Sequence, residues 1–174
     1  MSKNHIIYLI GFMGSGKSTA GKKLASLLGW SFIDLDKKIE EHTGKTIIEI
    51  FSKDGEEYFR NLETQLIRDL KFNTNSVIST GGGTPCHNNN MDFMLETGLT
   101  IYLKLTPAEL KSRLSGARSE RPLIKDLDQT GLHSFIVEKL ADREKWYLRS
   151  DITAEGIDLD FKKLFLLVKS KLDL

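Results

Sequence analysis

The sequence predicts an α/β fold in which helices cover both faces of a five-stranded, mainly parallel sheet. Strand-like and helix-like segments alternate along the chain, as they do in repeated βα units. Residues 11–18 read Gly-Phe-Met-Gly-Ser-Gly-Lys-Ser and fit G-x-x-x-x-G-K-[ST], the pattern of a phosphate-binding P-loop. The chain has 174 residues, a usual size for one domain, so we expect residues 1–174 to form a single domain.

The surroundings of the P-loop pattern favour nucleotide binding. Residues 5–10 are a short apolar run typical of a buried parallel strand, and helical spacing follows the loop as far as Gly29. Glycines allow backbone N–H groups to point at phosphate oxygens, Lys17 can reach the β- and γ-phosphates, and the Ser18 hydroxyl can ligate Mg²⁺. An ordinary glycine-rich turn is the alternative, but strand, loop and helix stand in the order that a P-loop requires.

Hydrophobic spacing and turn residues predict the remaining elements. We expect the other strands at residues 31–35, 76–80, 100–105 and 151–153. We expect the later helices at residues 56–70, 89–96, 107–114, 130–148 and 159–172, with short helical pieces within residues 39–51. Residues 115–128 are polar and without a period, and we expect them to form a mobile lid. In such sheets, ligands bind beyond the carboxyl ends of the strands.

Composition excludes several classes of protein. Hydrophobic residues make up 40% of the chain and charged residues 28%, which is typical of a globular protein. The net charge is +1 and no Lys/Arg block is present, so we expect neither nucleic-acid nor membrane binding. The single cysteine, Cys86, cannot form an internal disulfide, and no apolar stretch approaches the ~20 residues of a membrane span. We therefore expect a cytoplasmic protein.

Two carboxylates follow the second predicted strand. Asp34 and Asp36 are two residues apart, and in a strand such residues share a face, where they could serve Mg²⁺ and a hydroxyl acceptor. The alternative is that Asp36 caps a helix beginning at Lys37 while Asp34 is solvated. Spacing alone does not choose between these interpretations, but the nearby P-loop crevice favours a functional one.

Two further motifs have both a structural and a functional interpretation. Arg60 and Glu63 lie three residues apart on a helix, which spacing alone reads as a surface ion pair worth ~0.2–0.5 kcal/mol. Alternatively, Glu63 holds the Arg60 guanidinium ready to grip an anion. Residues 81–83 are three glycines directly after a strand, which indicates a tight turn or close approach to a ligand rather than a plain flexible turn.

The predicted lid carries Arg118 and Arg121, and an arginine there could close over a γ-phosphate or be a solvated surface residue. The four histidines lack the spacing of metal ligands. Cys86 has no basic residue visibly paired with it, so we interpret it as structural or incidental.

Taken together, these residues resemble the shikimate kinase family, small P-loop kinases of aromatic amino-acid biosynthesis with a nucleoside-monophosphate-kinase-like fold. The resemblance covers nearly the whole chain. It rests on the P-loop, Asp-Leu-Asp at 34–36, Ile-Phe at 50–51, Tyr-Phe-Arg-Asn-Leu-Glu at 58–63, Thr-Gly-Gly-Gly at 80–83, Arg-Pro-Leu at 121–123, and Arg143 before Trp146-Tyr147. The P-loop alone is unspecific, but the ordered set of these motifs is much more specific.

This resemblance implies transfer of the ATP γ-phosphate to the 3-hydroxyl of shikimate, with Mg²⁺ as cofactor, by a three-layer α/β/α P-loop kinase, here expected to be monomeric. It implies that ATP is bound by Gly14, Ser15, Gly16, Lys17, Ser18, Thr19 and, from the lid, Arg121. It places the metal at Ser18 and Asp34, with Ser79 a weaker candidate. It implies that shikimate is bound by Asp36, Arg60, Gly82, Gly83 and Arg143, with an apolar wall of Phe51 and Phe59. Lys17, Asp36 and Arg121 are the expected catalytic residues.

The family also implies a brace. Glu63 is expected to support Arg60 from behind rather than pair with it on the surface. The family often has a proline after its fifth strand, where it contacts adenine, but residues 153–156 here are Thr-Ala-Glu-Gly, so the base contacts stay open, with Arg113 a candidate.

The rival functions, another small-molecule kinase or a regulatory protein, have distinct signatures. A kinase for a nucleoside monophosphate would need a base-recognising acceptor pocket, and a gluconate kinase would accept gluconate. A regulatory ATP-binding P-loop protein would ignore small acceptors, whereas Asp36, Arg60 and Arg143 argue for an acceptor site.

Overall fold

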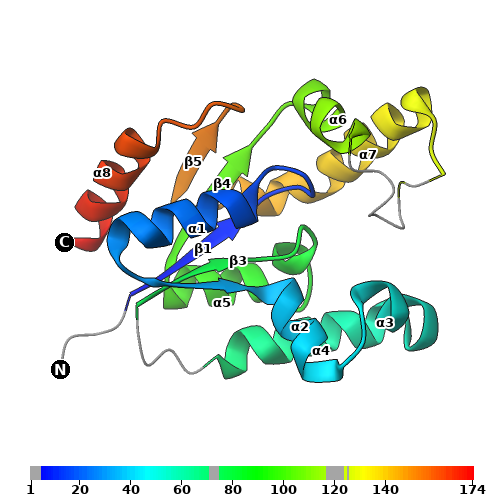
Figure 1. The fold of residues 1–174 in the computed structure, drawn as a ribbon, viewed down its shortest axis with the longest axis horizontal. Coiled ribbons are helices and arrows are strands. Elements are labelled where there is room, and N and C mark those ends of the chain that lie inside the picture. The colour runs from blue at the N-terminus through cyan, green and yellow to red at the C-terminus, as the bar shows by residue number, and fades with distance from the viewer. Residues whose placement is uncertain (1–4, 71–74, 117–123, 125) are drawn as a thin grey trace.

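The computed structural model describes residues 5–70, 75–116, 124 and 126–174. These residues contain a five-stranded sheet of parallel strands in the order β2-β3-β1-β4-β5 (Figure 1). The strands are β1 (Ile6–Ile10), β2 (Ser31–Asp34), β3 (Ser76–Ser79), β4 (Leu99–Lys104) and β5 (Ile152–Glu155). Because β1 lies at the centre, the loop that follows it emerges at the middle of the carboxyl edge.

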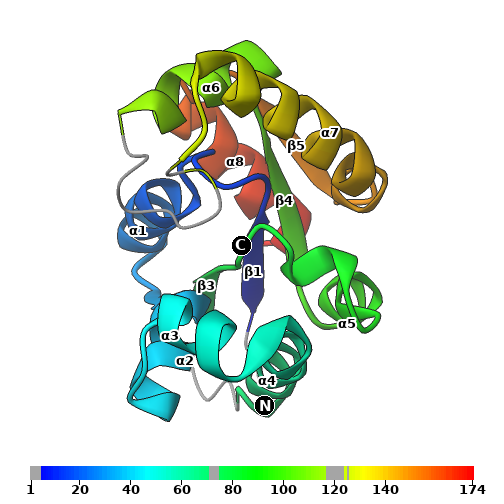
Figure 2. The same cartoon turned by 90° about the vertical axis from the view of Figure 1, so that its right-hand side faces the viewer.

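Helices cover both faces of the sheet, as the alternating pattern predicts. The helices are α1 (Lys17–Leu28), α2 (Leu35–Thr43), α3 (Ile47–Lys53), α4 (Gly55–Asp69), α5 (Asn90–Thr97), α6 (Pro107–Ser115), α7 (Gln129–Tyr147) and α8 (Phe161–Leu172), with a short 3₁₀ turn η1 (Thr84–Cys86). Figure 2 shows α1 on one side of the sheet and α5 and α7 on the other. The three-layer α/β/α prediction is confirmed.

Two apolar cores lie on the two faces of β1, because side chains alternate along a strand. Ile7 and Leu9 point into the core under α1 and α8, whereas Tyr8 and Ile10 point into the core beneath α5 and α7. All four are fully buried. This continuous burial is why the first strand reads as an uninterrupted apolar run.

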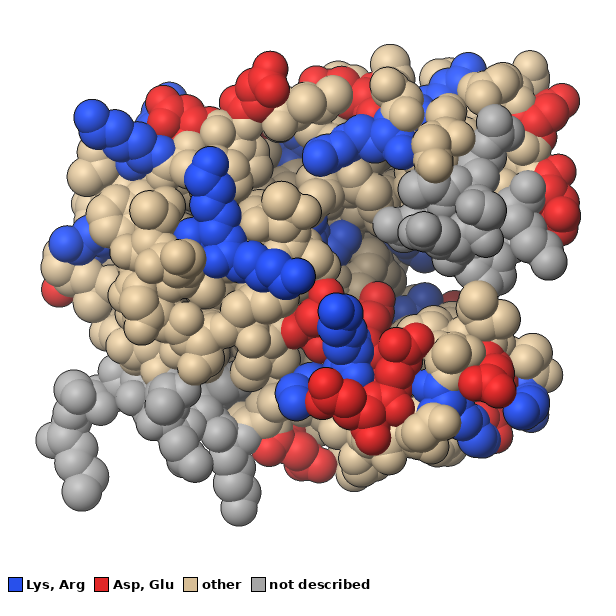
Figure 3. Space-filling view, in the orientation of Figure 1, with Lys and Arg blue, Asp and Glu red and all other residues tan. Residues whose placement is uncertain are grey.

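The helices separate into two groups at the carboxyl edge. Helices α2, α3 and α4 pack together below the end of the sheet, and α6 packs against α7 above it (Figure 1). Figure 3 shows the surface hollowed between these two groups. None of the described helices is long and apolar enough to cross a membrane.

The predicted boundaries agree with the structure to within a few residues, and capping side chains account for several of the ends. Thr106 caps α6 in a capping box with Glu109, and Pro107 takes the first helical position, as predicted. Gly44, at φ 66°, ends α2 within residues 39–51, where short helical pieces were expected. Helix α8 begins two residues later than predicted because the Asp160 side chain accepts from the Lys163 N–H.

Candidate active site

The P-loop connects β1 to α1 with a backbone that only glycine adopts easily. Gly14 and Gly16 have φ values of 78° and 90°. Lys17 begins α1, and its Nζ donates to the carbonyls of Gly11 and Phe12, each at 2.9 Å. Its side chain therefore arches back over the loop, with only 8% of the residue exposed. The helix start and the lysine together place positive charge at the mouth of the loop.

Three oxygen-bearing side chains meet beside the P-loop. The Ser18 hydroxyl donates to Asp34 Oδ2 at 2.7 Å and lies 3.3 Å from the Ser79 hydroxyl. Sheet register explains this, because Asp34 and Ser79 are partners at the ends of β2 and β3. Hydroxyl and carboxylate oxygens suit Mg²⁺, which uses few protein ligands and keeps water or phosphate on the rest. The described residues hold no group of three or more His, Cys, Asp or Glu that could form a cage for a metal.

Asp36 reaches the same cleft from a different element than predicted. Strand β2 ends at Asp34 and α2 begins at Leu35, so the argument that Asp34 and Asp36 share one strand face is wrong. The alternative helix cap was assigned to the wrong residue, because Asp34 Oδ1 accepts from the Lys37 N–H at 3.3 Å. Asp36 lies in the first helical turn. Burial, and then the charge of Asp34, raise the pKa of Asp36, while Lys17 and Arg60 oppose that rise.

Arg60 is held from behind by Glu63, as the family resemblance implies. Arg60 Nη1 donates to Glu63 Oε2 at 3.0 Å. The Thr84 hydroxyl donates to the other carboxylate oxygen. Glu63 has no exposed surface, so the interpretation of a solvated surface pair is wrong. Burial raises the pKa of Glu63, and the Arg60 charge opposes the rise.

Each of the three glycines after β3 is packed against a different site group. A Cβ on Gly81 would lie 2.9 Å from Glu63 Oε1 and 3.2 Å from Asp36 Oδ1. On Gly82 it would lie 3.2 Å from the Met13 N–H nitrogen and 3.3 Å from Arg143 Nη1, and on Gly83 it would lie 2.6 Å from the Arg60 guanidinium. None of the three has a positive φ. Close approach, rather than unusual backbone geometry, therefore requires glycine here.

Arg143 comes to the turn from α7. Its guanidinium carbon lies 5.6 Å from the centre of the Phe12 ring, next to the P-loop. It also lines a separate hollow of about 330 Å³ with Cys86, His87 and Trp146. Arg60 and Arg143, although 83 positions apart in sequence, thus reach neighbouring glycines of one turn.

The main cleft encloses about 350 Å³ and joins the P-loop to the glycine turn. Its lining includes Lys17, Ser18, Thr19, Asp34, Asp36, Gly81 and Gly82. The two predicted wall residues, Phe51 and Phe59, pack against each other with ring centres 4.7 Å apart. Phe59 is buried in the core and is next to Arg60, whose guanidinium lies 5.1 Å from its ring centre, but neither ring is among the residues that line this cleft.

The sequence indicates Arg113 only as a candidate for contacting the base, and it predicts no role for Tyr147 or Thr84. Arg113 Nη1 donates to the Ser15 carbonyl at 3.3 Å and flanks a smaller pocket of about 120 Å³, which also includes Ile157 and Phe161. The Tyr147 hydroxyl donates to the Gly82 carbonyl, and the Thr84 hydroxyl donates to the Glu63 carboxylate. Spacing along the sequence does not predict these contacts, because the two residues of each hydrogen bond belong to elements that are far apart in the chain.

Arg118 and Arg121, and with them most of the predicted lid at 115–128, lie outside the described residues. Cys86 is half-buried, and burial raises the pKa of its thiol to about 11. A thiol with so high a pKa is a poor nucleophile at neutral pH, in keeping with a structural interpretation.

A P-loop at the centre of a parallel sheet, two carboxylates beside it and two arginines packed against the neighbouring glycine turn define a P-loop kinase of a small molecule. The shikimate kinase family model matches residues 13–163. A shikimate kinase from Parabacteroides distasonis is 43% identical over 150 residues, which cover 86% of this chain and 87% of that protein. The chain belongs to the shikimate kinase family.

Solved structures agree with this assignment. The crystal structure of shikimate kinase from Bacteroides thetaiotaomicron matches with a TM-score of 0.89 at 37% identity, covering 98% of this chain and 99% of that one. Shikimate kinase from Acinetobacter baumannii in complex with shikimate matches with a TM-score of 0.85 at 32% identity, covering 98% and 94%. The predictions of a kinase fold and of this family are confirmed.

Proposed function

We propose that this protein transfers the γ-phosphate of ATP to the 3-hydroxyl of shikimate, giving shikimate 3-phosphate and ADP, in aromatic amino-acid biosynthesis. The observation that carries the proposal is the packing of the glycine turn. Gly82 lies against the P-loop on one side and Arg143 on another, while Gly83 lies against Arg60. An acceptor whose carboxylate is gripped by both arginines therefore lies directly beside the phosphate donor.

The donor side uses the P-loop. Backbone N–H groups of residues 14–19 and the Lys17 ammonium bind the phosphates, and Arg121 from the lid completes the cation set. Ser18 and Asp34 hold Mg²⁺, with Ser79 beside them, and the metal supplies charge neutralisation on the phosphates. Phosphoryl transfer needs positioning and charge neutralisation more than covalent catalysis, and this inventory supplies both.

The acceptor side uses Asp36, Arg60, Arg143 and the backbone of Gly82 and Gly83. The planar guanidinium fork matches a carboxylate and fixes the orientation of the ring. Asp36 accepts hydrogen bonds from the ring hydroxyls and can take the proton of the reacting one. The pKa of Asp36 is raised toward neutral pH. Its carboxylate is therefore a stronger base than that of a fully solvated aspartate. Phe51 and Phe59 support the apolar side of the pocket from the core.

The adenine base fits the pocket flanked by Arg113 and Ile157. A guanidinium can stack on a purine, and Ile157, which is 44% exposed, offers an apolar surface directly after residues 153–156, the segment in which the family often has a proline.

The chain works as one domain, a cytoplasmic monomer.

A coupled ADP-release assay tests this function. ATP with shikimate should give rapid ADP release that requires Mg²⁺, whereas gluconate and nucleoside monophosphates should leave the rate at the level of ATP alone. Product analysis by mass spectrometry should show one phosphate added to shikimate. Faster ADP release with gluconate or a nucleoside monophosphate than with shikimate would assign a different acceptor, and slow hydrolysis indifferent to every acceptor would indicate a regulatory P-loop protein.

A further inference from the structure

A buried tyrosine contacts the glycine turn at its middle residue. The Tyr147 hydroxyl donates to the Gly82 carbonyl with a distance of 2.5 Å, across 65 positions of sequence. Tyr147 has no exposed surface, and it is the last residue of α7. Burial raises the pKa of Tyr147, so its hydroxyl keeps its proton, and its donor role, at any physiological pH. The bond therefore joins the end of α7 to the turn.

All three carbonyls of the turn are occupied by protein donors. The Gly81 carbonyl accepts from the Thr84 N–H at 3.2 Å and the Gly83 carbonyl from the Cys86 N–H at 2.9 Å. The Gly82 carbonyl accepts from Tyr147. In the described part of the chain, the N–H groups of Gly82 and Gly83 donate to no protein acceptor. A turn whose carbonyls are fixed and whose N–H groups are available is suited to an anion.

Tyr147 is also coupled to the second arginine of the clamp. Arg143 precedes it by four residues on α7, so the two side chains share one helix face. Arg143 Nη1 would lie 3.3 Å from a Cβ on Gly82, the residue whose carbonyl Tyr147 holds. One helix end thus places both Arg143 and the carbonyl of Gly82.

We propose that Tyr147 is a positioning residue for the acceptor, and that its hydroxyl orients the Gly82 peptide so that this turn and Arg143 present a single anion site to the substrate carboxylate. The proposal rests on the proposed function and deepens it. It parallels the arrangement at Arg60, where Glu63 accepts from both Arg60 and Thr84, the first residue of η1. Tyr147 itself does not take part in phosphoryl transfer.

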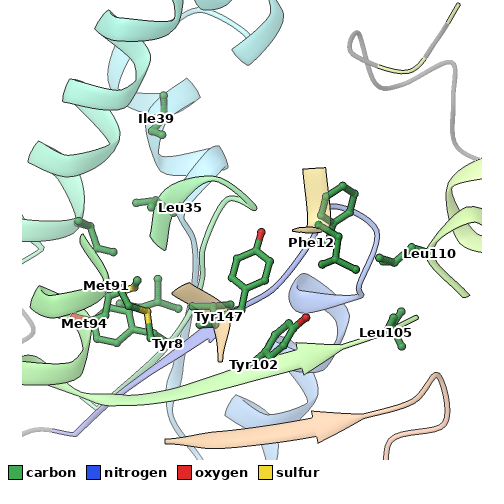
Figure 4. Packing of buried hydrophobic residues seen from close by; sticks show 14 of the residues in the cluster. Tyr8, Phe12, Leu35, Ile39, Met91, Met94, Tyr102, Leu105, Leu110 and Tyr147 are labelled. Atoms are coloured by element: carbon green, nitrogen blue, oxygen red, sulfur yellow. The ribbon is translucent and has the colours of Figure 1, made fainter. Parts of the chain in front are cut away.

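The chain offers a matched control in Tyr102 on β4. Its ring centre lies 5.1 Å from that of Tyr147, and only 1% of it is exposed (Figure 4). Its hydroxyl faces Glu144 at 3.4 Å instead of the glycine turn. Burial also raises the pKa of Tyr102, followed by the charge of Glu144. The variants Tyr147→Phe and Tyr102→Phe therefore remove the same atom from neighbouring buried rings.

The test is to titrate wild type and both variants separately with shikimate and with ATP by calorimetry, and to measure kcat and KM for each. We expect Tyr147→Phe to weaken shikimate binding about tenfold, because a buried carbonyl loses its donor, and to leave ATP affinity within twofold. Tyr102→Phe should leave both affinities within twofold. Hydrogen exchange of the segment around residues 81–83 should quicken only in Tyr147→Phe.

The outcomes separate the two proposals. If wild type fails to bind shikimate, the proposed function fails. If wild type binds it and Tyr147→Phe binds it equally well, the positioning role of Tyr147 is wrong. Equal losses in Tyr147→Phe and Tyr102→Phe, or parallel losses of ATP and shikimate affinity, would also overturn it, because they indicate general loosening of the core.

Discussion

Glu63 and Arg60 form an ion pair of 3.0 Å in which the carboxylate has no exposed surface and the arginine keeps 12% of its side chain exposed. The two partners therefore differ: the carboxylate is buried, whereas the guanidinium packs over Gly83 and keeps part of its surface exposed. A buried carboxylate is costly unless it is paired and hydrogen-bonded, and Glu63 has both Arg60 and Thr84. Such an arrangement fixes a cation at the edge of a site more firmly than a solvated pair does.

Glu63→Gln should weaken shikimate binding with little change in ATP binding. The amide keeps the shape but loses the charge that orients Arg60, and hydrogen bonds to charged groups contribute about 1.5–3 kcal/mol. A loss of roughly tenfold or more in shikimate affinity is expected from such a change. The control is Glu56→Gln, because Glu56 also contacts Arg60, at 3.3 Å, but is 61% exposed. Equal effects of the two substitutions would contradict the special role of the buried partner.

Arg60→Ala and Arg143→Ala should each weaken shikimate binding and leave ATP binding nearly unchanged. Removing one partner of a desolvated charge pair costs about 2–5 kcal/mol. Arg68→Ala is the control for helix α4, since Arg68 donates to the Asn88 carbonyl at 3.0 Å away from the turn. Calorimetric titration with each ligand gives the result, and a selective loss of ATP affinity in either clamp variant would place that arginine on the donor side.

Lys17→Ala should reduce turnover strongly, by roughly two orders of magnitude or more, as loss of a group that stabilises transition-state charge does. The fold should persist, because the backbone of the loop is set by its glycines and by the start of α1. Circular dichroism and kcat together check this. Near-normal turnover in a folded variant would remove the P-loop lysine from the mechanism.

The sequence predicts the sheet, the layers and most of the donor site because these depend on local patterns. The P-loop is contiguous, and the ends of β1, β2 and β3 follow from apolar runs. Arg60 and Glu63 are also close in sequence, but their spacing does not tell whether the pair is buried. That distinction depends on η1 packing over α4, which places Thr84 against Glu63.

The contacts made by distant residues could not be read from local patterns. The apolar run of the second strand does not show where the strand ends. Asp34 ends the strand and also caps α2, so Asp36 lies in a helix rather than on the strand. Tyr147 lies 65 positions from Gly82, and its aromatic character alone predicts only a core residue. The triple glycine did predict close approach, but the groups that approach it come from the P-loop, α2, α4, η1 and α7.

Asp36→Asn should stabilise the unliganded protein at neutral pH. Its pKa is raised in the folded state, mainly by burial, so the folded protein binds this proton more tightly than the unfolded chain. This tighter binding adds to the free energy of unfolding at low pH. The added stability is lost as pH rises from the pKa of Asp36 in the unfolded chain, about 4, through its higher pKa in the folded protein. Above this pH range Asp36 is charged, and burial of the charge destabilises the folded protein. Asparagine is uncharged, so the variant avoids this destabilisation.

Thermal unfolding from pH 3 to pH 8 measures this effect. The advantage of Asp36→Asn over wild type should be greatest at neutral pH and should shrink on acidification. Asp158→Asn is the control, because this exposed aspartate loses the same charge and is not among the charges that shift the pKa of Asp36. An advantage that is independent of pH, or a variant less stable than wild type at pH 8, would show that burial of the charged form is not what governs this site.

Asp36→Asn and Asp34→Asn should also differ in how turnover depends on Mg²⁺. Asp36→Asn keeps its shape but cannot take the hydroxyl proton, so kcat should fall by about 10²–10⁴-fold at every Mg²⁺ concentration if the base contributes fully. In a loose phosphoryl transition state the bond to the nucleophile is little formed, so removal of its proton matters less and the fall in kcat would be smaller. Asp34 contacts Ser18 at 2.7 Å beside the P-loop, so Asp34→Asn should raise the Mg²⁺ concentration needed for half-maximal rate. Turnover measured against Mg²⁺ for both variants decides the matter. Rescue of Asp36→Asn but not of Asp34→Asn by added Mg²⁺ would mean that the two carboxylates have exchanged roles.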